Sequence, residues 1–424
     1  MRKLRALVVV LVLTNLVVLG LLLARRAPAR QGPPNVLLFT VDMLRADHLS
    51  CMGQTAHQTP AMDAIAARGM LFERAYAQCD ITAQSYISMM TSRYPSEILA
   101  DDAQKVACPT LAQFLKDRGY RTGAVLSVAL LTQDTPLNES VHKLAFGQGF
   151  DDYFAVPPVA GQRLGETRRK GAESNAIALD WLGKQTDRPW FLWMHYRDLH
   201  PPLEPPAEFG PTVSAEARYG ACVSHVDSLI GEIMAWVKSA GLEENTTVVL
   251  ASPHGVGLPG SRLSIPRGPY DSMVHVPLIV ALPGGPRGKR VGGVVENLDV
   301  VPTLLKGGPG GFSGQDRSRG AGLAGYAFAQ SAHLEVYMAT DGRWKYVKYY
   351  RTILDPHDPN AKPPRPGQEE LFDLSVDPGE TTSLLARNRA QAEELRKVLA
   401  ARFPGGPGRP AAGTIRLLKP LDYF

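Results

Sequence analysis

Hydrophobic and polar residues follow two kinds of spacing along this chain, and the two kinds alternate. Short runs of β-branched, leucine and aromatic residues are typical of buried parallel strands. They lie at 35–42, 122–128, 188–195 and 246–252. Apolar residues at helical spacing predict helices at 60–68, 84–91, 110–118 and 215–240. Because strands and helices alternate, we predict an α/β fold with a mostly parallel central sheet flanked by helices.

The last part of the chain has a different pattern. A Gly-rich stretch at 307–325 is followed by a predicted hairpin at 336–348 with its turn at Asp341-Gly342. We interpret 370–374 as a polar loop and 390–403 as a helix. These features predict a main α/β domain over 35–329 and a small C-terminal α+β subdomain over 330–424.

The first residues have the composition of a targeting segment. Ala6 to Ala24 is an apolar run with basic residues on both sides, and its length of 19 residues is close to the ~20 that cross a bilayer as a helix. We predict that 1–27 is an uncleaved signal anchor, with a cleaved signal peptide as the alternative, and that 28–34 is a linker. The body of the protein would then be membrane-anchored and extracytoplasmic, on the periplasmic or extracellular face.

The net charge of +5 comes from this leader. Residues 1–30 carry six Lys or Arg and no acid, so the remainder has 40 basic and 41 acidic residues, a net charge of 40 − 41 = −1. A body without excess positive charge offers no electrostatic surface for nucleic acid, and we expect no nucleic-acid partner.

Polar residues gather where the predicted strands end. Asp42 follows the first strand, His195 and His200 lie at the end of the 188–195 strand, and His254 follows the 246–252 strand. Thr82 precedes a predicted helix. The carboxyl ends of parallel strands are where ligands bind in such sheets. An acid and a histidine there suit a metal site, and a hydroxyl at a helix start suits a nucleophile, although each residue also has a purely structural interpretation as a helix cap or a buried hydrogen-bonded side chain.

Several stretches in family order resemble the sulfatase family of the alkaline phosphatase superfamily. The matching stretches are 35–53, 59–63, 91–95, 109–112, 119–122, 195–200, 245–255, 276–279 and 342–345. The resemblance implies a mixed α/β fold and a divalent-metal hydrolase for sulfate or phosphate esters.

The nucleophile position departs from the family pattern. The resemblance implies a Cys or Ser oxidised to formylglycine in a Cys/Ser-x-Pro-Ser-Arg motif, and Thr82-Ala-Gln-Ser-Tyr86 stands there. Threonine is a secondary alcohol whose oxidation gives a ketone, so we expect no formylglycine. A direct Thr82 nucleophile remains, which would suit attack on phosphorus better than on sulfur and would need an activating metal.

The expected metal ligands also differ from the family pattern. Many family members have an Asp-Asp pair where this chain has Asp42-Met43, and an acid where it has Pro253 in Ser-Pro-His254-Gly. The remaining ligand candidates for Ca²⁺, Mg²⁺ or Zn²⁺ are Asp42 and His254, which is a small anionic set for a hard dication.

On the substrate side, the resemblance places His200 on the anion or leaving group. Tyr86 replaces the family arginine, and Arg267 is a loosely aligned stand-in for the later lysine. Asp80 is a further candidate for a replacement metal ligand. Two hypotheses follow: a sulfatase-family protein with an impaired metal centre, weak or no hydrolysis and a role in binding an anion or a partner, or an active ester hydrolase or transferase that uses Thr82.

Overall fold

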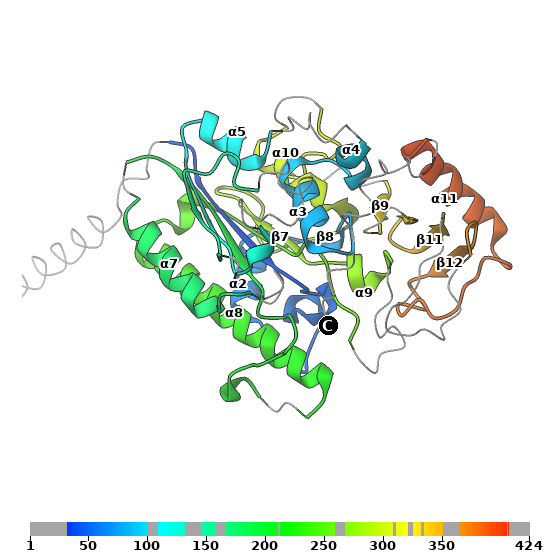
Figure 1. Ribbon diagram of the computed structural model, residues 1–424, viewed down its shortest axis with the longest axis horizontal. Coiled ribbons are helices and arrows are strands. Elements are labelled where there is room, and N and C mark those ends of the chain that lie inside the picture. Colours follow the sequence, from blue (N-terminus) through cyan, green and yellow to red (C-terminus); the bar gives the residue numbers. More distant parts are fainter. Residues whose placement is uncertain are drawn as a thin grey trace, which may run out of the picture.

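The structure, a computed structural model, has a large mixed sheet covered by helices on both faces and a second, smaller sheet beside it (Figure 1). The residues that it describes are 32–100, 109–131, 146–157, 159, 167–185, 187–210, 213–258, 268–307, 311–320, 325–331, 335–350, 365–404 and 406. The predicted anchor and most of the linker therefore lie outside the described residues. None of the helices in the described ranges is both long and apolar enough to cross a bilayer.

Eight strands form the main sheet within the described part of the chain. In spatial order they are β4 (Asp152–Phe154), β3 (Arg121–Val125), β5 (Trp190–Tyr196), β1 (Asn35–Val41), β6 (Thr246–Ala251), β7 (Leu278–Ala281), β2 (Met70–Tyr76) and β8 (Lys289–Glu296). Only β7 runs antiparallel to its neighbours among these strands. The mostly parallel sheet that the sequence predicts is confirmed.

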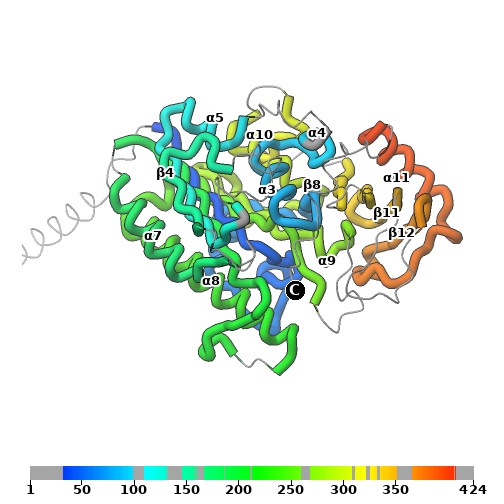
Figure 2. Tube along the Cα trace, in the orientation of Figure 1, coloured from blue at the N-terminus to red at the C-terminus, as the bar shows by residue number. Residues whose placement is uncertain are grey.

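Strand β1 lies in the middle of this sheet, between β5 and β6 (Figure 2). All seven of its residues are buried. Val36 and Leu38 pack into the core on one face, and Leu37, Phe39 and Val41 pack into the core on the other. A strand that is buried on both faces must be apolar throughout, which is why this run is almost continuously hydrophobic.

Most of the helices divide between the two faces of the main sheet. The helices are α2 (Pro60–Arg68), α3 (Thr82–Thr91), α4 (Pro95–Ala100), α5 (Leu111–Asp117), α7 (Gly171–Gly183), α8 (Ala215–Ser239), α9 (Asp271–Val274), α10 (Val300–Leu304) and α11 (Arg389–Arg402). Apolar residues of α2, α7 and α8 belong to one core, and those of α3, α5 and α10 belong to the other. The two faces of the sheet are therefore both sheltered from water.

The second sheet is antiparallel and carries the C-terminal helix α11. Its order is β12 (Glu369–Asp373), β11 (Trp344–Tyr349), β10 (Val336–Thr340) and β9 (Ala327–Gln330). The predicted hairpin is confirmed as β10 and β11, and Gly342 in its turn has a φ of 87°, which favours glycine. The interpretation of 370–374 as a loop is wrong, because all but the last of these residues lie in the edge strand β12 paired with β11.

One helix start is capped by a residue distant in sequence. Asp227 of α8 accepts hydrogen bonds from the backbone N–H groups of Ala61 (3.0 Å) and Met62 (2.8 Å) in the first turn of α2. Its pKa is raised to about 6 because burial opposes its charge, and these two hydrogen bonds act in the opposite direction. We expect Asp227→Ala to lower the free energy of unfolding by about 1–3 kcal/mol, because it leaves two buried donors unpaired.

Urea denaturation measures this loss. Ser214→Ala is a matched control, since Ser214 caps α8 itself by accepting from the Ala217 N–H at an exposed site. We expect the control to cost about 1 kcal/mol or less. Equal losses for the two variants would show that the link between α2 and α8 contributes nothing beyond an ordinary cap.

Candidate active site

The carboxyl ends of three adjacent strands meet the start of α3. Asp42 directly follows β1, and its N–H donates to the carbonyl of Tyr196, the last residue of β5. The register pairs Val41 with Tyr196, so Arg197, the residue directly after β5, comes level with Asp42. This edge of the sheet is where the sequence predicts the site.

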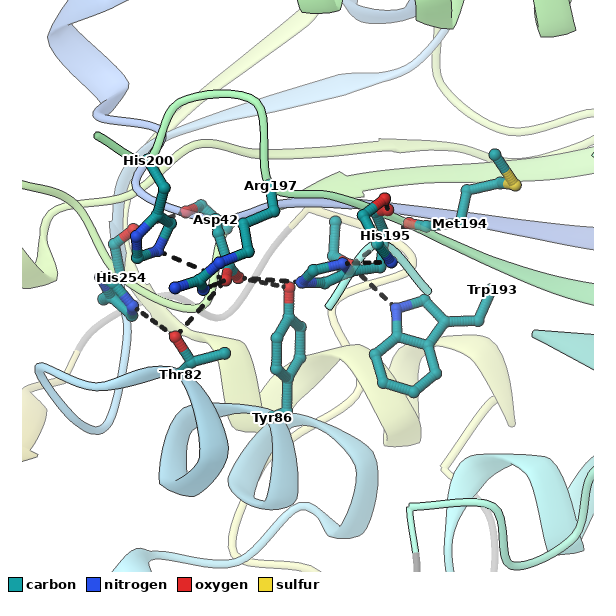
Figure 3. A network of polar contacts seen from close by, with 12 residues as sticks. Asp42, Thr82, Tyr86, Trp193, Met194, His195, Arg197, His200 and His254 are labelled. Atoms are coloured by element: carbon teal, nitrogen blue, oxygen red, sulfur yellow. Dashed lines mark hydrogen bonds and ion pairs between the residues drawn. The ribbon is translucent and has the colours of Figure 1, made fainter. Parts of the chain in front are cut away.

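Asp42 is the centre of a buried polar network (Figure 3). The Tyr86 hydroxyl donates to its Oδ1 at 2.8 Å, and Arg197 Nη1 donates to its Oδ2 at 3.1 Å. His195 Nε2 lies 3.3 Å from Oδ1, and His200 Nε2 lies 3.7 Å from Oδ2. Each of these side chains is at most 3% exposed, so the charge of Asp42 is balanced by the protein and not by water.

The electrostatics of Asp42 follow from these neighbours. Burial by itself would raise its pKa, yet His195, Arg197 and His200 together hold the pKa well below the usual range. The pKa of His200 is also well below its usual value, first because of burial and then because Arg197 repels a second positive charge. Asp42 is therefore an anion paired with one permanent cation, Arg197.

The hydrogen bonds of His195 define its tautomer. The backbone N–H of Ser127 donates to His195 Nδ1 at 3.1 Å, so Nδ1 carries the lone pair. The proton of the neutral ring is then on Nε2, the atom that faces Asp42. The ring therefore directs an N–H towards the carboxylate at 3.3 Å, without the alignment of a hydrogen bond.

The Thr82 hydroxyl lies beside a histidine nitrogen that can accept its proton. Its Oγ1 lies 3.0 Å from His254 Nε2 and 3.4 Å from Asp42 Oδ2. His254 Nδ1 is 2.8 Å from the carbonyl of Gly255, which can only accept, so Nδ1 carries the proton and Nε2 is free to accept from the Thr82 hydroxyl. Burial lowers the pKa of His254, which favours this neutral form. A neutral imidazole that accepts from a hydroxyl has the arrangement of a general base.

The turn after β6 holds His254 in place. The Ser252 hydroxyl donates to the His254 carbonyl, and Asn297 Nδ2 donates to the Ser252 carbonyl, both at 2.8 Å. A Cβ on Gly255 would lie 2.1 Å from the Ser272 carbonyl oxygen, so only glycine fits after His254. The peptide chain around His254 is fixed on both sides.

The structure brings most of the predicted site residues together. Asp42, Thr82, His200 and His254 all lie in this network, and Arg267 lies outside the described residues. Thr82 is not the N-cap of α3, because Ile81 occupies that position and Thr82 begins the helix.

The remaining candidates have other partners. The Asp80 carboxylate accepts from the Gly268 N–H at 3.0 Å. Met43, at the position of the family's second acid, packs its side chain into the core shared by α2 and α8.

Sequence reasoning missed three members of the network. Tyr86 appears there only as the loss of an arginine, His195 appears only as one of the polar residues at a strand end, and Arg197 has no role. For His195 and Arg197 the available signal was their place at the end of a strand that neighbours β1. For Tyr86 it was the spacing of one helical turn from Thr82, which places both side chains on the same face of α3.

Comparisons with known proteins identify the family of this chain. A family model described as Sulfatase matches residues 34–307, which is more than half of the chain. The chain belongs to the sulfatase family.

Individual sulfatase-family relatives are distant but extend along most of the chain. An N-acetylgalactosamine-6-O-sulfatase of Bacteroides thetaiotaomicron is 22% identical, with 86% of this chain and 92% of the relative covered. Human arylsulfatase A is 25% identical, with 90% and 91% covered. Among solved structures, a phosphonate monoester hydrolase of Agrobacterium radiobacter aligns with a TM-score of 0.68 and 20% identity over 87% of this chain and 95% of that one. That structural likeness shows the fold.

Sulfatase-family enzymes generally use a divalent metal. The question is therefore whether the side chains at this edge of the sheet can bind one. Asp42 is the only carboxylate in the described network, and both of its oxygens already accept from donors of the chain. A guanidinium 3.1 Å from that carboxylate would repel a dication. Across the described ranges, no three acidic, histidine or cysteine side chains are arranged as metal ligands. This donor set does not fit Ca²⁺ or Mg²⁺, which need several anionic oxygens.

Proposed function

We propose that this sulfatase-family chain has lost the metal-dependent hydrolysis of sulfate and phosphate esters. The observation that carries the proposal is the buried ion pair of Asp42 and Arg197, in which the one carboxylate of the network is already neutralised. Thr82 adds support, because a threonine side chain cannot become the formylglycine aldehyde. What such a scaffold can still do is bind an anion or a protein partner.

A turnover assay of the full-length protein tests this proposal. An aryl sulfate, an aryl phosphate and a phosphonate monoester are each incubated with Ca²⁺, Mg²⁺, Mn²⁺ or Zn²⁺, and then with EDTA. We expect rates equal to those of Thr82→Ala under every condition. Metal-stimulated turnover that Asp42→Asn and Thr82→Ala both abolish would overturn the proposal.

The hydrogen bond between Thr82 and His254 favours a second candidate, an active hydrolase or transferase for phosphate, phosphonate or sulfate esters. In that reaction Thr82 Oγ1 forms a bond to phosphorus while its proton moves to His254 Nε2. The bond from phosphorus to the ester oxygen breaks, and the leaving oxygen takes the proton from His254. Water or another alcohol then releases the phosphoryl group from Thr82.

Trapping the intermediate separates the two candidates. If the second candidate is correct, reaction with an aryl phosphate adds the mass of a phosphoryl group to the peptide that contains Thr82. Thr82→Ser should keep this reaction, and His254→Gln should lose it. Thr91→Ala is the matched control, since Thr91 lies in the same helix and its hydroxyl donates to the Ile87 carbonyl. The first candidate predicts no phosphorylated peptide in any of these proteins.

We also propose that residues 1–27 anchor the protein in a membrane with its body on the extracytoplasmic side. The support is the apolar run from Ala6 to Ala24 between basic residues. Membrane fractionation followed by protease treatment of intact cells tests this placement. A full-length protein in the soluble cytoplasmic fraction would contradict it.

A further inference from the structure

We propose that Arg197 is a built-in replacement for a metal ion, a cation of the chain itself that holds the strand ends of the sheet together. The inference rests on the proposed function above and deepens it, because it assigns the residue that makes a metal unnecessary. Nothing in the sequence pattern alone assigns this role to Arg197.

The first argument is position. Arg197 Nη1 lies 3.1 Å from Asp42 Oδ2, and the Thr82 hydroxyl lies 3.4 Å from the same oxygen. The guanidinium therefore shares the oxygen that faces the nucleophile position. Figure 3 shows Arg197 reaching from the end of β5 towards the Asp42 carboxylate between His200 and His195.

The second argument is charge. The Arg197 side chain is 3% exposed and that of Asp42 is 0% exposed, so neither ion is neutralised by solvent. A buried carboxylate without a counter-ion is strongly destabilising, and either a dication or a guanidinium can supply the missing charge. Arginine is a permanently charged residue type, so this pairing does not depend on metal supply.

The third argument is connection. Asp42 follows β1, Arg197 follows β5, and Tyr86 of α3 donates to the other carboxylate oxygen. The three segments are joined through one carboxylate, as a metal joins the segments that carry its ligands. Arg197 is thus a positioning residue that acts on the sheet edge through Asp42.

The test is chemical rescue of the full-length Arg197→Ala protein. Its thermal unfolding temperature is measured with methylguanidinium or Mn²⁺, beside the unaltered protein and the double variant Arg197→Ala/Asp42→Asn. We expect Arg197→Ala to melt lower and to recover by about 4 °C or more with either cation. The unaltered protein and the double variant should not respond.

A matched control removes an arginine from another ion pair. Arg121 makes a two-pronged contact with Asp152 at 2.9 Å, but its side chain is 36% exposed and water can replace it. Arg121→Ala should show no cation-dependent recovery. Recovery there as well would mean that the cations act non-specifically, and this would overturn the inference.

Each of the remaining possible results either supports or overturns the inference. If Arg197→Ala does not fold, a folded Arg197→Lys that is insensitive to EDTA supports the need for a cation at this position. If neither variant folds, the unaltered protein decides, and a change in its melting temperature with EDTA overturns the inference. A wild-type melting temperature in Arg197→Ala, without rescue, overturns this inference alone, because the turnover assay still tests the proposed function. One equivalent of dication held by the unaltered protein and lost in Asp42→Asn overturns both.

Discussion

Replacing Lys345 by methionine is expected to lower the free energy of unfolding by about 3–5 kcal/mol. Lys345 lies in β11 and is fully buried, and its Nζ lies 2.8 Å from carboxylate oxygens of both Asp271 and Glu380. Burial alone would lower its pKa, yet the two acids raise it, so the ammonium stays charged. Without it, two carboxylates would face each other in the protein interior.

The location of Lys345 gives this loss a structural consequence. Asp271 begins α9, the short helix packed beside the His254 turn through the bond from the Gly255 N–H to the Met273 carbonyl. Lys345 therefore ties the second sheet to the segment that supports the candidate site. Guanidinium chloride denaturation of the variant measures the loss directly.

The matched control is Lys397→Met on the surface of α11. Its side chain is 75% exposed and its ammonium lies 3.9 Å from Glu393, so we expect a change of about 0.5 kcal/mol or less. A second comparison uses Lys345→Met/Asp271→Asn/Glu380→Gln, which should cost less than Lys345→Met because no net charge is left buried. If the triple variant were the less stable of the two, charge would not be the reason for the loss.

The parts of the fold that could be predicted are those with a local signal. β1 and the helices α2 and α8 have unbroken apolar runs or helical spacing, and they lie within a residue of their predicted bounds. Strand β8 contains two adjacent glycines, and β12 begins with two acids at a sheet edge, so neither shows the apolar run of a buried strand. Pairing with neighbours forms these strands, and a single sequence does not display that pairing.

The same limit applies to the site. Asp42, Thr82, His200 and His254 could be predicted because each stands in a motif that the family resemblance marks. Arg197 and Tyr86 could not, because their roles depend on which segments meet Asp42 in space. Tyr86 also shows how a substitution misleads when it is considered alone. A positive charge is lost at that position on α3, while Arg197 supplies one from the end of β5.

The second large effect concerns pH, and it depends on Glu296 at the end of β8. Burial, with a smaller contribution from neighbouring Asp299, raises the pKa of Glu296 to about 8. The folded protein thus holds a proton that the unfolded chain releases near its ordinary pKa of 4.5. The stability from this proton is complete at pH values below 4.5 and is lost as pH rises through about 8.

We therefore expect the contribution of Glu296 to the free energy of unfolding to fall by a few kcal/mol between pH 5 and pH 8.5, since one pKa unit corresponds to about 1.4 kcal/mol. Glu296→Gln should flatten this part of the curve, because an amide does not titrate. Urea denaturation at intervals of half a pH unit measures both curves. The surface variant Glu393→Gln should keep the slope of the unaltered protein.

The contacts of Glu296 explain why the loss would reach the second sheet. Its carboxyl group accepts from the Tyr94 hydroxyl at 2.8 Å and from the Phe328 N–H of β9 at 2.9 Å, and Gln78 Nε2 lies 3.3 Å away. Ionisation at high pH would place a buried negative charge beside Asp299 at the junction of the two sheets. Hydrogen exchange should then show β9 amides losing protection between pH 7 and pH 9, after correction for the intrinsic rate, in the unaltered protein and not in Glu296→Gln. Equal protection in both proteins would place the pH sensitivity elsewhere in the fold.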